Sequence, residues 1–186
     1  MIASEKLGEG LSRFTVPLSY YPLFVKPVTE GSSKGIDDFN KVYEPTELEQ
    51  AVQGLKSRLP GQDVLVESFL SGRELTVSIL GTGAYSQVIG VREFIWQKSP
   101  SYSQSRNGYH SKQDFTSRKS KSSKCNYPSV CNDSHDMNNP QIKAACQVAL
   151  DAWNVFGCRD AGRVDIRFDS DNPDSVPNVL EVSITT

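Results

Sequence analysis

GRVDIRFD at residues 162–169 and NVLEVS at residues 178–183 are the two stretches that decide the fold of this chain. Each is an apolar run typical of a β-strand, and each carries one carboxylate in its middle, Asp165 in the first and Glu181 in the second. The turn-rich residues 169–177 join the two runs, which predicts neighbouring strands. We therefore expect both carboxylates within one β-sheet.

The spacing within these strands places a second polar residue beside each carboxylate. Because side chains alternate between the faces of a strand, Arg163 shares a face with Asp165, and Ser183 shares a face with Glu181. Two carboxylates buried in adjacent strands repel each other unless a cation lies between them. Oxygen ligands without sulfur or imidazole favour Mg²⁺ or Mn²⁺, generally shared with substrate phosphates. The alternative is a half-exposed sheet on which both carboxylates face solvent.

The preceding motif is VLVESFLSGRE, residues 64–74, in which two carboxylates flank a short connection between strands. Glu67 lies near the end of one apolar strand and Glu74 opens the next. Such a connection can offer edge backbone groups to a purine and a carboxylate to a ribose hydroxyl. The alternative is a plain hairpin with charged rims, which is the commoner use of this pattern.

FVKPVTEGSSKGI, residues 24–36, is the first motif along the chain. Lys26 leaves a predicted strand and is followed by a turn of small residues. An ammonium group beside several backbone N–H groups suits a polyphosphate. Taken alone the motif is weak, because a lysine at a strand end is usually solvated.

Periodic segments fill the rest of the chain. Apolar residues recur at intervals of three and four over residues 45–59, which predicts an amphipathic helix that stops at Pro60-Gly61. A second helical stripe covers residues 142–156 and ends at Gly157. Runs of neighbouring strands with few helices favour an α+β fold of antiparallel sheets in two layers. We expect the strands at residues 23–25, 39–43, 64–70, 75–80, 88–95, 163–168 and 178–184.

Residues 97–124 differ from their surroundings and predict a mobile loop. They contain nine serines, seven Lys or Arg residues and one acidic residue, with no apolar period. Disordered surface is the simpler interpretation of this composition. A basic flap that closes over a phosphate site has the same composition, so the role of the loop depends on what lies beneath it.

The overall composition excludes several classes of protein. A formal net charge of −2 gives no basic field for nucleic acid. The four cysteines lack the paired spacing of a zinc site and indicate reduced thiols, and no secretory leader or membrane-spanning run is recognised. We therefore expect a soluble cytoplasmic protein with a small-molecule ligand, and neither nucleic acid nor a membrane as partner. A homodimer is left open, because the pattern carries no sign of the oligomeric state.

Taken in series, four motifs make the chain resemble the D-alanine:D-alanine ligase family of ATP-grasp enzymes over residues 22–183. They are KPVTEGSSKGI, VLVESFLSGRELTVSILG, GCRDAGRVDIRFD and VLEVS. The resemblance implies an ATP-grasp fold, with two small lobes of antiparallel sheet, packed helices and a nucleotide cleft between them. In that scheme residues 1–21 are a lead-in, 22–70 the first lobe and 71–186 the second lobe, with a mobile flap at 97–134.

The same resemblance implies roles for individual residues, with ATP and Mg²⁺ or Mn²⁺ as cofactors. A flap lysine of the family follows a phenylalanine by six residues, a spacing that Phe115 and Lys121 have here, although Lys119 is nearly as plausible. Arg163 would stabilise the acyl-phosphate and the tetrahedral intermediate. The catalytic residues would be Arg163, Ser33 and Lys121; the nucleotide contacts Lys26, Glu30, Ser32, Glu67, Ser68, Phe69, Leu70 and Glu74; and the metal ligands Asp165, Glu181 and Ser183.

The implied reaction joins small amino acids by phosphorylating one carboxylate with ATP and letting a second amine attack the acyl-phosphate. The chain departs from the family pattern at two positions. Ser183 stands where the family has an asparagine, and Ser122 stands where it has a tyrosine after the flap lysine. The family's amino-terminal domain and its last proline-glycine loop are also not found in this sequence. The alternatives are a catalytically degenerate module that binds ATP and Mg²⁺, and an unrelated α+β protein.

Overall fold

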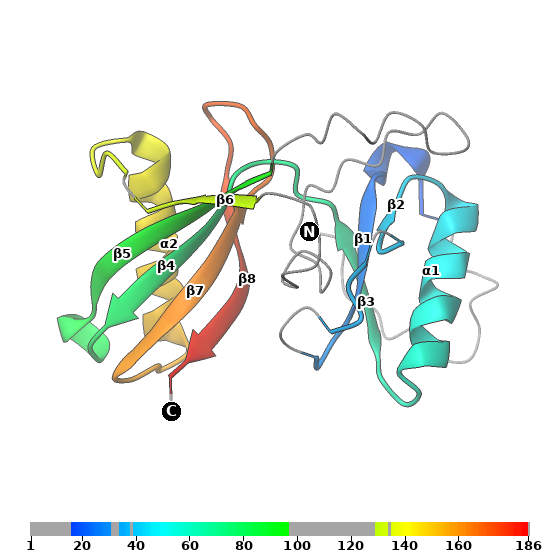
Figure 1. Cartoon of the computed structure of the whole chain (residues 1–186), viewed down its shortest axis with the longest axis horizontal. Coiled ribbons are helices and arrows are strands. Elements are labelled where there is room, and N and C mark those ends of the chain that lie inside the picture. Colours follow the sequence, from blue (N-terminus) through cyan, green and yellow to red (C-terminus); the bar gives the residue numbers. More distant parts are fainter. Residues whose placement is uncertain (1–15, 31–33, 38, 97–128, 134, 186) are drawn as a thin grey trace. The chain divides into compact units, whose positions relative to one another are not determined.

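Two units make up the chain in the computed structural model (Figure 1). Among the described residues, those up to Phe69 belong to the first unit and those from Leu70 onward to the second. Each unit has its own β-sheet, its own long helix and its own hydrophobic core. The described residues are 16–30, 34–37, 39–96, 129–133 and 135–185.

The first unit is a three-stranded antiparallel sheet with one helix packed on it. β1 (Leu23–Pro27) lies in the middle, between β2 (Lys41–Val42) and β3 (Val64–Ser68). α1 (Pro45–Arg58) packs on one face of this sheet, and the short 3-10 helix η2 (Leu18–Tyr20) precedes β1. The core between α1 and the sheet is apolar and includes Leu23, Val25, Val42, Val52, Leu55 and Val64.

α1 forms where the apolar spacing predicts it. Pro45 occupies the first turn, where a missing backbone N–H costs no hydrogen bond. Glu47 accepts a hydrogen bond from the backbone N–H of Tyr43 at 2.7 Å, which fixes the entry of the chain into the helix. Beyond the last turn, Gly61 adopts a positive φ of 82° and turns the chain toward β3. The buried side is formed by Leu48, Ala51, Val52 and Leu55.

The second unit is a five-stranded antiparallel sheet with a helix, α2, along one face (Figure 1). The strand order is β6-β5-β4-β7-β8, so the two strands that carry Asp165 and Glu181 are neighbours at one edge. The elements are β4 (Glu74–Leu80), the 3-10 helix η3 (Gly83–Tyr85), β5 (Gln87–Trp96), β6 (Ser129–Asn132), α2 (Pro140–Val155), β7 (Ala161–Phe168) and β8 (Pro177–Ile184).

α2 packs against one face of the five-stranded sheet, so the opposite face is the candidate for a binding site. Asn139 caps the helix by accepting hydrogen bonds from the backbone N–H groups of Gln141 and Ile142 at 3.0 and 3.3 Å. At the other end Trp153 is fully buried, and its indole N–H donates to the carbonyl of Gly81 at 3.1 Å. A Cβ on Gly162 would lie 2.7 Å from the Trp153 ring, so only glycine allows this close approach.

The α+β class and the order of the predicted helices and strands are confirmed, with two differences. The strand expected at residues 39–43 has only two residues, because Asn40 is buried in a turn and donates to the carbonyls of Val25 and Gly35. β6 was not predicted, and it lies inside the range expected to form the flap. Its four residues, SVCN, are too few to show an alternating pattern.

Within the described part of the chain, no helix combines the length and apolar character that crossing a membrane requires.

Candidate functional site

The polar face, which we define as the face of the five-stranded sheet turned away from α2, carries both predicted metal ligands. Leu75, Val77 and Val164 pack in the core beside α2, so the residues that alternate with them point to the other side. On that side Thr76 of β4 lies directly opposite Asp165 of β7. In turn, Asp165 lies directly opposite Glu181 of β8. The register therefore lines up Thr76, Asp165 and Glu181 in one row across three strands.

Hydrogen bonds and charge orient the Asp165 carboxylate within this row. The Thr76 hydroxyl donates to Asp165 Oδ1 at 2.7 Å. Arg163, two residues earlier on the same face, places its Nε 3.5 Å from the same oxygen. The Asp165 side chain is 25% exposed and the Arg163 side chain 52% exposed, so the carboxylate is partly shielded while the guanidinium reaches into solvent.

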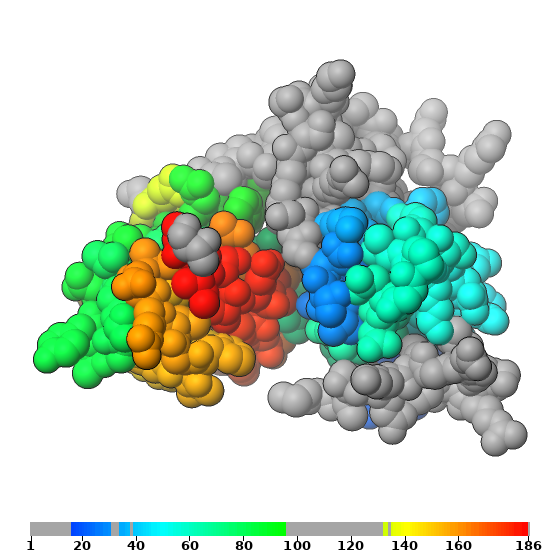
Figure 2. All heavy atoms as spheres, turned by 90° about the horizontal axis from the view of Figure 1, so that it is seen from below, coloured from blue at the N-terminus to red at the C-terminus, as the bar shows by residue number. Residues whose placement is uncertain are grey.

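Glu181 lies farther out than Asp165 and is exposed. The Ser183 hydroxyl donates to Glu181 Oε1 at 3.2 Å, which places the third predicted ligand beside the second. β8 residues are visible at the surface of the second unit in Figure 2, in red. Glu181 is thus the solvent-facing member of the predicted pair, whereas Asp165 is partly shielded.

The donor set formed by Asp165, Glu181 and Ser183 fits a hard divalent cation that keeps open coordination positions. This set offers two carboxylates and one hydroxyl, with no sulfur or imidazole. Within the described residues, no three His, Cys, Asp or Glu side chains gather into a complete metal site. Magnesium does not need such a cage, because water and phosphate oxygens usually complete its shell.

A second charge pair, Glu74 with Arg167, lies on the polar face at the end where β4 begins. Glu74 Oε2 accepts from Arg167 Nη1 at 2.8 Å, and the two side chains are only 10% and 5% exposed. Glu74 was predicted to contact a ribose; the structure places it in a buried ion pair, and the ribose contact stays a prediction. Sequence reasoning missed Arg167, although its alternation with Asp165 places it on the same face.

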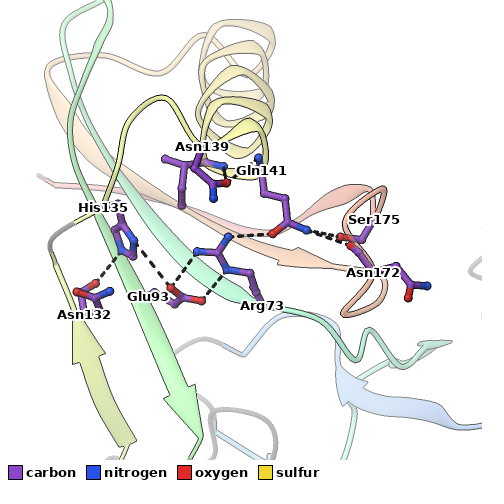
Figure 3. A network of polar contacts seen from close by, with 9 residues as sticks. Arg73, Glu93, Asn132, His135, Asn139, Gln141, Asn172 and Ser175 are labelled. Carbon is purple, nitrogen blue, oxygen red and sulfur yellow. Dashed lines mark hydrogen bonds and ion pairs between the residues drawn. The ribbon is translucent and has the colours of Figure 1, made fainter.

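On the α2 side, Arg73 forms a polar network that the sequence pattern does not predict (Figure 3). Its guanidinium makes a bidentate pair with Glu93 at 2.7 and 3.0 Å and donates to Gln141 at 2.9 Å. Hydrogen bonding to Glu93 raises the pKa of Arg73 above its ordinary value. Gln141 then donates to Ser175 and to the carbonyl of Asn172. The network therefore joins the residue that precedes β4 to β5, to the start of α2 and to the β7–β8 connection.

The first unit has its own candidate face, the lysine–aromatic face, which we define by Phe24, Lys26, Lys41, Glu67 and Phe69. Phe24 and Lys26 of β1 and Glu67 of β3 alternate with buried core residues, so their side chains point away from α1. Lys26 Nζ lies 2.6 Å from Glu67 Oε1, with the two side chains 24% and 35% exposed. Two predicted nucleotide contacts are thus brought together as a half-buried ion pair.

Aromatic rings and a second lysine complete this face. Lys41 of β2 lies directly opposite Phe24 of β1. Its Nζ is 3.7 Å from the centroid of the Phe69 ring, and the Phe24 and Phe69 rings are 6.0 Å apart. Lys41 was not predicted, because its position on this face depends on the register between β1 and β2.

Comparison with known proteins identifies the family. A family model described as "D-ala D-ala ligase C-terminus" matches residues 9–179. The chain belongs to this family. Its ATP-grasp fold and its relation to the D-alanine:D-alanine ligases are thereby confirmed.

Individual relatives agree with the family match. The chain is 34% identical over 163 residues to the D-alanine–D-alanine ligase of Methylacidiphilum infernorum, covering 87% of this chain and 44% of the relative. In fold it is similar to the L-amino acid ligase of Bacillus licheniformis, with a TM-score of 0.62 at 18% identity, covering 96% of this chain and 36% of that one. The D-alanine–D-alanine ligase of Bacillus anthracis complexed with ATP gives a TM-score of 0.55 at 17% identity, with coverages of 87% and 40%.

In this D-ala D-ala ligase C-terminus domain, some of the remaining predicted residues lie within the described structure and others lie outside it. Glu30 pairs with Lys34 at 2.9 Å, whereas Ser32 and Ser33 lie outside the described residues. Lys121 and the neighbouring Phe115, Lys119 and Ser122 also lie outside them. Ser68 ends β3, and the backbone N–H of Phe69 donates to the carbonyl of Pro22 at 3.0 Å. Leu70 follows as the first residue of the second unit.

One prediction joins residues of different units. Lys26 belongs to the first unit, whereas Asp165 and Glu181 belong to the second. Their convergence on one ligand therefore stays a prediction.

Proposed function

We propose that this chain binds ATP with Mg²⁺ and takes part in joining small amino acids through an acyl-phosphate. One observation carries the proposal: Asp165 lies opposite Glu181 on the polar face, with Arg163 and Thr76 beside it. Membership of the D-ala D-ala ligase C-terminus family supports the reaction class. The chain spans 44% of the length of its Methylacidiphilum relative, so the activity of the whole relative is proposed here and not transferred.

The metal ligands of this proposal are Asp165, Glu181 and Ser183, and Mn²⁺ would fit the same oxygen set. A bound divalent cation would neutralise charge on the phosphate oxygens. Ser183 is a weaker ligand than the asparagine of the family pattern, because a hydroxyl offers less charge density than an amide carbonyl. We therefore expect one of the metal positions to bind with reduced affinity.

The proposed nucleotide contacts come from residues of both units. The backbone of residues 67–70 would hold the adenine, Lys26 would contact the phosphates, and Glu74 would contact the ribose. Glu30 and Ser32 would belong to the loop that closes over the phosphates. The Bacillus anthracis ligase solved with ATP supports this assignment at the level of the fold. As domains we propose a lead-in at 1–21, a first lobe at 22–70 and a second lobe at 71–186 with a flap at 97–134.

The proposed chemistry has two steps. A carboxylate oxygen of the first amino acid attacks the γ-phosphorus of ATP, and ADP leaves with the electrons of the broken P–O bond. The amine of the second amino acid then attacks the acyl carbon, loses a proton and expels inorganic phosphate. Arg163, which reaches into solvent from the polar face, would stabilise the developing negative charge. Ser33 and Lys121 are proposed as further catalytic contacts.

Calorimetric titration with ATP and Mg²⁺ tests the binding part of the proposal. The double variant Asp165→Ala with Glu181→Ala removes both carboxylates of the row, and we expect ATP binding to weaken at least about tenfold. The matched control is Asp151→Ala with Asp171→Ala, which removes two exposed carboxylates outside the row. Equal heats from the double variant and the wild type would contradict the proposal.

Phosphate release tests the reaction. Wild-type protein with ATP and Mg²⁺ is incubated with a panel of D- and L-amino acids, and we expect release above background with at least one small amino acid. Arg163→Met should abolish this release while ATP still binds. Binding without release across the panel would leave a nucleotide-binding module and refute the ligase.

A further inference from the structure

Lys41 has no role predicted from the sequence, yet its charged side chain contacts the segment proposed to hold adenine. Its Nζ lies 3.7 Å from the centroid of the Phe69 ring and 5.5 Å from that of the Tyr43 ring. At 3.7 Å an ammonium group interacts strongly with the negative face of an aromatic ring. The main partner of Lys41 among these two rings is therefore Phe69.

Phe69 is contacted from several directions on the lysine–aromatic face. The Phe24 ring lies 6.0 Å away at an interplanar angle of 44°, within the range of a favourable aromatic pair. The backbone N–H of Phe69 donates to the carbonyl of Pro22 at 3.0 Å. β3 itself ends at Ser68, so these contacts determine where the chain runs immediately beyond the strand.

We propose that Lys41 is a positioning residue for nucleotide binding: through its cation–π contact it holds Phe69, and with it the backbone of residues 67–70, in the geometry that receives adenine. The inference rests on the proposed function and deepens it. Lys41 then acts on the base and not on the phosphates. It differs in this respect from Lys26, whose Nζ pairs with Glu67 on the same face.

The variants that test this inference separate the charge from the length of the side chain. Lys41→Met keeps an unbranched apolar stem and removes the charge, whereas Lys41→Arg keeps a cation that can stack on the ring. We expect Lys41→Met to weaken Mg-ATP binding about three- to tenfold in calorimetry, and Lys41→Arg to stay within about twofold of the wild type. Lys56→Met on α1, whose helix packs on the opposite face of the sheet, is the matched control and should bind as the wild type does.

A double-variant cycle shows whether Lys41 acts through Phe69. Phe69→Leu removes the ring, so Lys41→Met should add little further loss in the Phe69→Leu background. Independent, additive losses would overturn the inference.

Tripolyphosphate distinguishes positioning of the base from direct contact with phosphate. It carries the charge of the ATP phosphates without the base, so its affinity measured with Mg²⁺ should be the same for the wild type and Lys41→Met. An equal loss for ATP and tripolyphosphate would make Lys41 a phosphate ligand and overturn the inference. Unchanged ATP affinity in Lys41→Met would overturn the inference alone, whereas a wild type that binds no ATP would refute the proposed function and the inference with it.

Discussion

The polar face and the lysine–aromatic face show how two antiparallel sheets can differ in the side chains that they turn away from their helices. On the five-stranded sheet, rows of directly opposed residues collect carboxylates and guanidinium groups, as in Asp165 with Glu181. On the three-stranded sheet, the cations are lysines, and they lie against a carboxylate or an aromatic ring. In the proposed function, the first arrangement would hold a metal ion, and the second would contact a base with its phosphates.

Burial is the sharpest difference between the two faces. Arg167 with Glu74 and Lys26 with Glu67 are both cation–carboxylate pairs at hydrogen-bonding distance. The first pair is almost completely buried, whereas the second is about a quarter to a third exposed. Because the cost of stranding a charge rises steeply with burial, the two pairs should respond very differently to the loss of one partner.

The largest expected effect is on the buried pair. Arg167→Met strands the Glu74 carboxylate in a buried position, and we expect a loss of about 3–5 kcal/mol in the free energy of unfolding. Urea unfolding followed by circular dichroism measures it. The double variant Arg167→Met with Glu74→Gln should recover part of the loss, because it removes the stranded charge. A loss below about 1 kcal/mol in Arg167→Met would show that the pair is solvated.

Alternation and spacing explain why part of this molecule can be predicted from its sequence. α1 and α2 follow from apolar residues at intervals of three and four, and the shared strand faces of Asp165 with Arg163 and of Glu181 with Ser183 follow from the period of two. Both depend only on residues close in the chain.

Contacts that depend on the register between strands cannot be predicted from local spacing. Thr76 meets Asp165 across 89 positions of the chain. Local spacing holds no information on which residues of β4 face which residues of β7, since a shift by two residues preserves every alternation. The cation–π contact between Lys41 and Phe69 could not be predicted from the sequence for the same reason.

The next effect concerns metal binding on the polar face. Thr76→Val keeps the shape of the side chain but removes the hydroxyl that donates to Asp165 at 2.7 Å. We expect Mg²⁺ affinity, measured by Mn²⁺ competition in the presence of ATP, to fall about tenfold, as for other residues that orient a ligand. Thr76→Ser keeps the hydroxyl and should stay near the wild type. If Thr76→Val and the wild type bind Mg²⁺ with equal affinity, the hydrogen bond from Thr76 is not needed to orient the Asp165 carboxylate for the metal ion.

The half-exposed pair on the lysine–aromatic face should matter little for stability. Glu67→Gln removes one charge of the pair with Lys26, and we expect a change below about 1 kcal/mol in the free energy of unfolding, because solvent screens both partners. The same urea titration used for Arg167→Met measures it, so the two faces are compared directly. A loss comparable to that of Arg167→Met would remove the contrast between them.

The smallest expected effect concerns Arg92 and Asp133, an exposed pair at the β5 end of the polar face. Arg92 lies opposite Thr76, and its guanidinium makes two hydrogen bonds to Asp133 at 2.6 and 2.8 Å. These bonds lower the pKa of Asp133, so any stabilisation is present above the ordinary carboxylate pKa and disappears as the pH falls through the lowered value. Asp133→Asn should therefore lower the free energy of unfolding only slightly at pH 7, because the pair is exposed, and the difference from the wild type should vanish as the pH falls through the lowered pKa of Asp133. Urea titrations at pH 7 and pH 3 measure the free energy of unfolding at each pH. A large loss of this free energy at pH 7 would mean that this exposed pair also anchors β6 to β5.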